Sequence, residues 1–119
     1  MKEADIVRAI LRYLKTVPGC FAWKEHGGMY GTAGIPDIIA CIGGRFYGFE
    51  VKTDTGKPTK LQEATIRKIL NSGGTALVVR SVNEVRAAIE PSAINNESEN
   101  NAFDETKTQR DNKRRNRRQ

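Results

Sequence analysis

The sequence predicts an α/β fold with the element order α-β-β-β-α-β-α. Two stretches, residues 3–15 and 59–73, place apolar residues at helical spacing, and the short apolar runs around them are typical of strands. Gly43-Gly44 separates two of these runs as the turn of a tight hairpin. One strand follows the second long helix, so we expect a right-handed crossover to a parallel neighbour. The chain should therefore build a small mixed sheet flanked by helices.

The first half of this fold should hold one helix and three strands. The helix over residues 3–15 ends before Pro18-Gly19. A loop over residues 25–34, with four glycines in ten residues, separates the first two strands. The three strands are expected over residues 20–24, 35–42 and 45–52. Their order predicts an antiparallel meander.

The second half should hold a helix, a strand and a last short helix. Thr59 opens the first of these helices and Gly73-Gly74 closes it. A strand is expected over residues 75–81, and a helix over 82–90 should stop at Pro91.

Composition changes at Pro91. We expect one folded domain over residues 1–91, because the segment 92–119 has too few apolar residues to offset its ordering entropy and should be disordered. The tail ends in residues 107–119, which hold seven bases and one acid. This basic end is either a solvated terminus or a non-specific phosphate tether.

The chain is basic, with a formal net charge of +6. This charge favours a polyanionic partner, nucleic acid before a membrane surface. No apolar run is long enough to span a membrane, and no organic cofactor is expected. Without a recognisable secretion signal, Cys20 and Cys41 should be buried, reduced thiols in a cytoplasmic protein.

Two acids fall at unusual places in the expected hairpin. If the chain turns at Gly43-Gly44 in a regular register, Asp37 lies directly opposite Glu50 on one sheet face. Two facing like charges destabilise a sheet unless something compensates them. A divalent cation would do so, because carboxylate oxygens suit Mg²⁺.

Lys52 follows Glu50 on the same face. Two carboxylates, a cation and a lysine can activate water and stabilise a phosphoryl transition state. Taken singly, Asp37 is also typical of a strand start, and Glu50 with Lys52 of a solvated strand face. We favour the metal site, because the surrounding strands look buried and buried charges need partners.

The motifs Pro36-Asp37 and Glu50-Val51-Lys52, with 12 residues between the two acids, resemble the PD-(D/E)xK nuclease superfamily. Within it, the chain is most similar to stand-alone VRR-NUC proteins of phages and bacteria, which look related to Holliday junction resolvases. The similar segments are GIPDIIA, FEVKTDTGKPTKLQ and TALVVRS, and the resemblance covers roughly residues 1–90. It implies a restriction-endonuclease-like core. One departure is Ser81, which follows Val78-Val79-Arg80 where the family's element has a second arginine.

The resemblance also implies roles for individual residues. Asp37 and Glu50 would bind Mg²⁺, or Mn²⁺ in its place, with the Val51 carbonyl as a further ligand. Lys52 would orient or activate the attacking water. Glu3 would add an acid to the metal site and Gln62 would act near it. Both have alternatives: Glu3 favours the helix dipole, and Gln62 completes a capping box with Thr59.

The resulting prediction is a Mg²⁺-dependent DNA endonuclease, structure-selective for branched DNA such as a four-way junction, acting as a homodimer in a bacterial or phage-infected cytoplasm. The alternative is a nucleic-acid-binding module with the same fold and no significant cleavage. Facing acids argue against a pure binder, since they would repel phosphate unless a metal intervened. The candidate phosphate contacts, each also typical of a surface base, are Lys24, Arg45, Lys57, Lys60 and Arg80.

Overall fold

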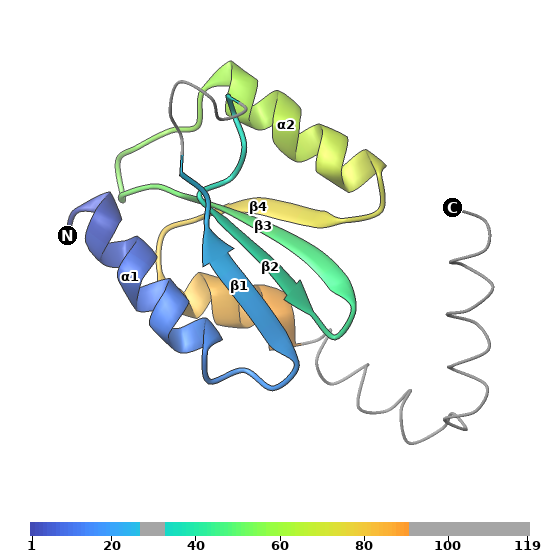
Figure 1. Ribbon diagram of the computed structural model, residues 1–119. Helices are drawn as coiled ribbons and strands as arrows, with labels where there is room; N and C mark the ends of the chain where they lie inside the picture. The colour runs from blue at the N-terminus through green and yellow to red at the C-terminus, as the bar shows by residue number, and fades with distance from the viewer. Residues whose placement is uncertain (27–32, 91–119) are drawn as a thin grey trace.

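The computed structural model describes residues 1–26 and 33–90 (Figure 1). The elements follow the predicted order, with bounds a few residues shorter than expected at several ends. They are α1 (Glu3–Leu14), β1 (Cys20–Lys24), β2 (Ile38–Ile42), β3 (Arg45–Val51), α2 (Lys60–Asn71), β4 (Thr75–Val79) and a last helix over residues 82–90. The tail predicted over 92–119 lies outside the described residues.

The four strands form one sheet in the order β1-β2-β3-β4. The first three are antiparallel, and β4 returns parallel to β3 after α2. In the hairpin, Ile42 pairs with Arg45 and Ile38 with Phe49. Gly43 and Gly44 have φ of 58° and 79°, as a two-residue turn with left-handed backbone at both positions requires. The expected register is therefore confirmed.

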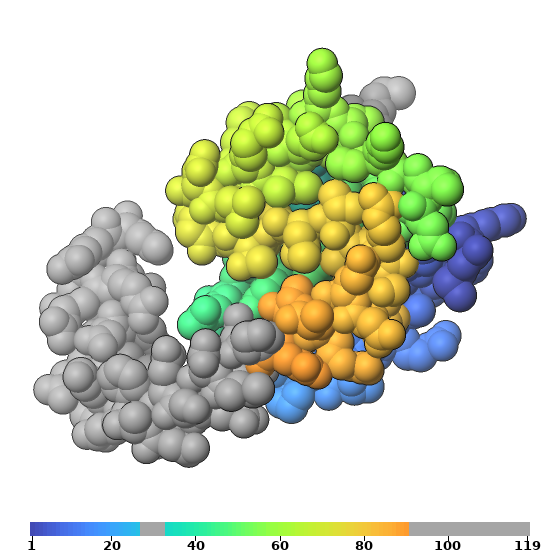
Figure 2. All heavy atoms as spheres, turned by 180° about the vertical axis from the view of Figure 1, so that it is seen from behind, coloured from blue at the N-terminus to red at the C-terminus, as the bar shows by residue number. Residues whose placement is uncertain are grey.

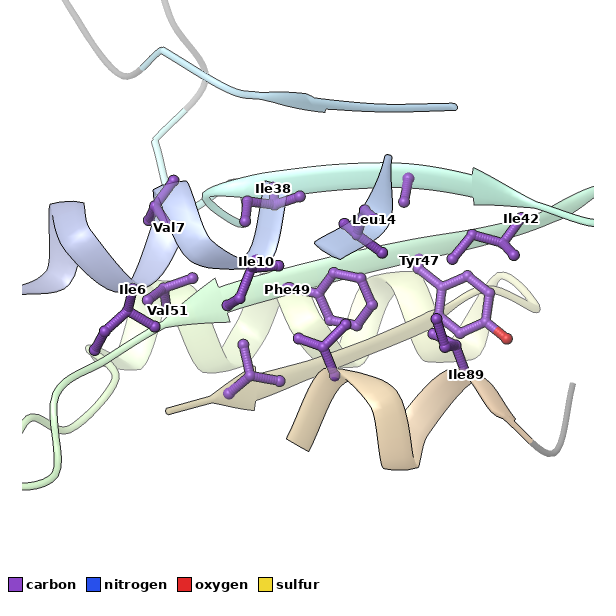
Figure 3. Close-up of a cluster of buried hydrophobic side chains, with 13 residues drawn as sticks. Ile6, Val7, Ile10, Leu14, Ile38, Ile42, Tyr47, Phe49, Val51 and Ile89 are labelled. Atoms are coloured by element: carbon purple, nitrogen blue, oxygen red, sulfur yellow. The ribbon is translucent and has the colours of Figure 1, made fainter. Parts of the chain in front are cut away.

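The core lies between one face of the sheet and two helices. Figure 3 shows Ile6 and Ile10 of α1 facing Val51 and Phe49 of β3, with Ile89 of the last helix beside Tyr47. α1 contributes its apolar stripe because these residues recur every three to four positions. The side chains of Tyr47, Phe49 and Val51 on β3 point into this core. Because side chains alternate along a strand, Glu50 and the other even-numbered residues of β3 lie on the opposite face.

The opposite face is only partly covered. α2 packs against β3 and β4 and has no fully buried residue; Figure 2 shows α2 beside β4 at the surface. Phe21, Cys41 and Phe46 form one cross-strand row on β1, β2 and β3, and all three are exposed. Both cysteines are free, but the expected burial is wrong: Cys41 lies on the uncovered half of this face and Cys20 is half-buried. Within residues 1–26 and 33–90, no helix is long and apolar enough to cross a membrane.

Candidate active site

The site begins with Asp37, the residue before β2. Pro36 has no N–H to donate to the sheet, so regular pairing stops here. Oδ2 of Asp37 instead accepts the backbone N–H of Val51 at 2.7 Å. The register that pairs Ile38 with Phe49 places Asp37 opposite Glu50. The carboxylate of Asp37 is thus anchored to the end of β3, beside Glu50.

Glu50 is the one buried charged residue of the described chain, with 2% of its surface exposed. Burial raises the pKa of its carboxyl to about 8. A hydrogen bond to Asp37 and the charges of Asp37 and Glu3 act in the same direction, while Lys52 opposes them. Two adjacent carboxyl groups therefore hold a proton that a cation could replace.

Lys52 brings a positive charge to this pair. Its Nζ lies 3.9 Å from Oε2 of Glu50, and its side chain is 13% exposed. The backbone N–H of Lys52 donates to the carbonyl of Val79 at 3.0 Å, which continues the pairing of β3 with β4. The backbone of Lys52 is therefore held by β4, while its side chain lies on the sheet face that carries Glu50.

Gln62 comes from α2, and it both forms the predicted capping box and contacts Glu50; its catalytic role stays a prediction. Its Oε1 accepts the N–H of Thr59 at 2.8 Å, and the Thr59 hydroxyl accepts the N–H of Gln62 at 3.1 Å, which forms the capping box. Its Nε2 donates to Oε2 of Glu50 at 3.2 Å. The first turn of α2 is thus joined directly to the buried carboxylate.

The donor set fits a Mg²⁺ ion. Mg²⁺ keeps several waters and is commonly held by one or two carboxylates together with substrate phosphates. Asp37 and Glu50 supply two. Across the described residues, no three His, Cys, Asp or Glu side chains come close enough to hold a metal ion together. Glu3 is exposed and near enough to raise the pKa of Glu50; its part in metal binding, like that of the Val51 carbonyl, stays a prediction.

The candidate phosphate contacts have different surroundings. Lys24, Arg45, Lys57 and Lys60 are exposed, as a contact to nucleic acid requires. Arg80 is half-buried, and its guanidinium donates to the backbone carbonyls of Thr53 and Gly56, the latter at 2.7 Å. Arg80 therefore holds the loop between β3 and α2. Because its guanidinium already donates to two carbonyls, its geometry does not support a role as a phosphate contact.

Sequence reasoning missed Glu25. Its backbone N–H donates to the carbonyl of Asp37 at 2.8 Å, which extends the β1–β2 register by one pair. Glu25, Asp37 and Glu50 thus follow one another across three strands, and the carboxylate of Glu25 accepts the Trp23 indole N–H at 2.6 Å. A long glycine-rich connection does not fix strand register as a two-residue turn does. The sequence therefore contained no signal that placed Glu25 in this row.

Facing carboxylates and a lysine at the end of a central hairpin of a mixed sheet are the arrangement that the PD-(D/E)xK resemblance implies. The family model for the archaeal Holliday junction resolvase (Hjc) matches residues 6–111. The chain belongs to this family of DNA nucleases. The resemblance carried by Pro36-Asp37 and Glu50-Val51-Lys52 is confirmed at the level of the superfamily.

Solved structures confirm the fold. One described as "VRR_NUC domain" superposes with a TM-score of 0.62 at 23% identity, over 74% of this chain and 94% of that one. Another, described as "VRR_NUC domain protein", has a TM-score of 0.63 at 20% identity, over 76% and 86% of the two chains. No curated protein matches. The restriction-endonuclease-like α/β fold is thereby established.

Proposed function

We propose that this nuclease is a metal-dependent DNA endonuclease that cuts branched DNA as a homodimer. The observation that carries the proposal is the contact between Asp37 and the buried Glu50. Glu50 is buried and Asp37 is half-buried, and placing these two carboxyls against each other is costly unless they are paired or bind a cation. Lys52, 3.9 Å from Glu50, supplies only one positive charge for the two acids. A site built only to bind DNA would gain nothing from this arrangement.

The proposed chemistry is hydrolysis of a phosphodiester. When bound, Mg²⁺ would supply Lewis-acid activation of water and would offset charge on the phosphate. Asp37 and Glu50 would hold the ion. Lys52 would donate to the attacking water or to a phosphate oxygen and stabilise the charge that develops there. Gln62 would keep Glu50 oriented through its Nε2 contact.

A cleavage assay tests the proposal. Purified protein would be incubated with a four-way junction, a splayed arm, a linear duplex and single-stranded DNA, each with Mg²⁺, Mn²⁺ or EDTA. Paired, symmetric nicks in the junction that disappear with EDTA are the expected result. Tight binding to all four forms without cutting would support the binding-module alternative instead.

The homodimer is supported by the uncovered sheet face. Phe21 is 71% exposed and Phe46 43%, and they share a cross-strand row with Cys41. Trp23 is 40% exposed, and its ring lies 5.4 Å from that of Phe21. Clustered exposed aromatic side chains are typical of association surfaces. A junction has two strands to cut and the described residues hold one proposed site, so two copies joined through this face would match the substrate.

Light scattering on the purified protein tests the dimer. The wild type should have twice the mass of one chain, and Phe21→Ser with Phe46→Ser should yield a monomer that still folds, because both side chains lie outside the core. Leu70→Ser, at an exposed apolar residue near the end of α2, is the matched control and should stay dimeric. If the double variant kept the wild-type mass, the dimer interface would not be this sheet face.

Gly48→Ala is expected to reduce cleavage as well as stability. A Cβ at this position would lie 2.9 Å from Cγ of Pro36 and 3.3 Å from its Cβ. Pro36 must therefore shift, and Asp37 with it. We expect a loss of about 1–3 kcal/mol in unfolding free energy, typical of overpacking, and a slower cleavage rate at temperatures where the variant is folded.

Gly44→Ala is the control for this variant. Nothing lies within 4 Å of a Cβ there, but φ is +79°, so alanine costs about 1 kcal/mol in backbone strain. Urea unfolding and single-turnover cleavage would be measured for both. Equal cleavage by the two variants would contradict the claim that Gly48 leaves room for Pro36 and Asp37.

A further inference from the structure

The first turn of α2 contains a hydrogen-bonded chain that ends at the buried acid. It starts at the backbone N–H of Thr59, which donates to Oε1 of Gln62 at 2.8 Å. It continues through the amide of Gln62, whose Nε2 donates to Oε2 of Glu50 at 3.2 Å. Among the described residues, the Thr59 N–H has no other acceptor, so it donates only to Gln62.

The Thr59 N–H determines which way the amide of Gln62 points. A side-chain amide has an acceptor end and a donor end. Because a backbone N–H can only donate, the oxygen of Gln62 must face Thr59. The NH₂ group must then face Glu50, where it finds a carboxylate oxygen. A flipped amide would set two donors against each other at Thr59 and two acceptors against each other at Glu50.

The position of Thr59 is itself fixed. Its hydroxyl accepts the N–H of Gln62 at 3.1 Å, and its carbonyl accepts the N–H of Glu63 at 2.9 Å. Its φ of −74° and ψ of 165° are the extended values of an N-cap residue. The cap of α2 therefore acts as a rigid reference for the Gln62 side chain.

We propose that Thr59 is a positioning residue of the active site, acting through Gln62 to hold Glu50. This inference rests on the proposed function. Gln62 and Lys52 both approach Oε2 of Glu50, and Oε1 makes neither contact. Holding Oε2 limits the movement of the carboxylate and would leave Oε1 to join Asp37 in binding a cation. Groups that orient metal ligands in this way commonly change metal affinity or activity by about 10–100-fold.

Thr59→Pro and Thr59→Ala separate the N–H from the hydroxyl. Alanine removes the hydroxyl and keeps the N–H, whereas proline removes both. Proline suits the observed φ of −74°. Thr59→Ser keeps both groups and should behave as wild type. Each variant would be measured for Mn²⁺ affinity by calorimetry without DNA, for single-turnover cleavage and for melting temperature.

We expect Thr59→Ala to melt several degrees lower, as for the loss of an N-cap, while Mn²⁺ affinity and cleavage stay within about three-fold of wild type. Thr59→Pro should lower both by roughly 10–100-fold. In the Gln62→Ala background the two substitutions should have equal effects on both, because the N–H then has no partner. Ser81→Ala is the matched control: it removes the same kind of cap bond, 3.2 Å to the N–H of Glu84, from a helix that does not carry Gln62.

Amide hydrogen exchange gives a test that needs neither metal nor cleavage. The Thr59 N–H should be protected in the wild type and lose its protection in Gln62→Ala. If Thr59→Pro does not fold, this exchange measurement on the wild type and Gln62→Ala still tests the proposal. An unprotected Thr59 amide in the wild type would overturn the proposal. So would equal effects of proline and alanine with Gln62 present, or a proline effect that persists without Gln62. If the wild type cut none of the DNA forms, the proposed function would fail, whereas Mn²⁺ affinity and exchange would still decide the role of Thr59.

Discussion

Lys52→Ala is expected to reduce the rate of DNA cleavage by about 100–1,000-fold, the usual cost of losing one group that stabilises a transition-state charge. DNA binding should change by no more than a few-fold, because a single phosphate contact carries little of the affinity. The Nζ of Lys52 lies 3.9 Å from the Glu50 carboxylate and its side chain is largely buried, which places its charge beside the two acids. Single-turnover cleavage and fluorescence anisotropy would measure the two quantities.

Asp37→Asn and Glu50→Gln should lose cleavage to a similar degree while binding DNA. Lys68→Ala is the matched control for Lys52→Ala, since it removes a positive charge from an exposed position on α2. It should cut at the wild-type rate. Glu50→Gln with wild-type cleavage would contradict the assignment of Glu50 as a metal ligand.

Glu50→Gln is expected to stabilise the fold at alkaline pH when no metal is present. The pKa of Glu50 is about 8 in the folded protein, against 4.5 for an ordinary glutamate. Between these values the native state binds more protons than the unfolded state, so stability falls as the pH rises. The loss is complete above the folded pKa and is on the order of a few kcal/mol. Glutamine carries no charge, so the variant should not lose this stability.

Urea unfolding in EDTA between pH 5 and 9 measures this difference. The wild type should lose stability across the range, and Glu50→Gln should lose much less. Glu63→Gln, at an exposed acid of α2, is the control and should follow the wild type. Added Mg²⁺ should restore stability to the wild type at pH 9, because a ligand that binds only the folded state stabilises it. Parallel curves for wild type and Glu50→Gln would contradict a buried, metal-free Glu50 with a raised pKa.

The part of the site on the hairpin was predictable from the sequence. A two-residue turn fixes the register of both flanking strands, so Gly43-Gly44 was enough to set Asp37 opposite Glu50. The pleat then decided that Lys52 shares their face. Gln62 was predictable only as two alternatives, since local patterns indicate a cap or a site residue but not a side chain that uses its two ends for both.

The remaining features depend on packing between distant segments. No local pattern states that α2 lies over β3 and β4 and leaves the aromatic side chains of β1 uncovered. Arg80 looked like a surface base, because its acceptors are backbone carbonyls 24 and 27 residues earlier in the chain. Glu25 was hidden because a ten-residue loop does not set a register.

The contacts of Arg80 have a consequence for when the enzyme becomes competent. The loop that leads from Lys52 to Thr59 is held by Arg80, which follows β4, and by the pairing of Lys52 with Val79. One anchor is the last residue of β4 and the other is the residue that follows it. A chain still being synthesised therefore lacks them until residue 80 has left the ribosome, even though every residue of the proposed metal site has already been made. We therefore expect no cleavage activity before residue 80 has emerged.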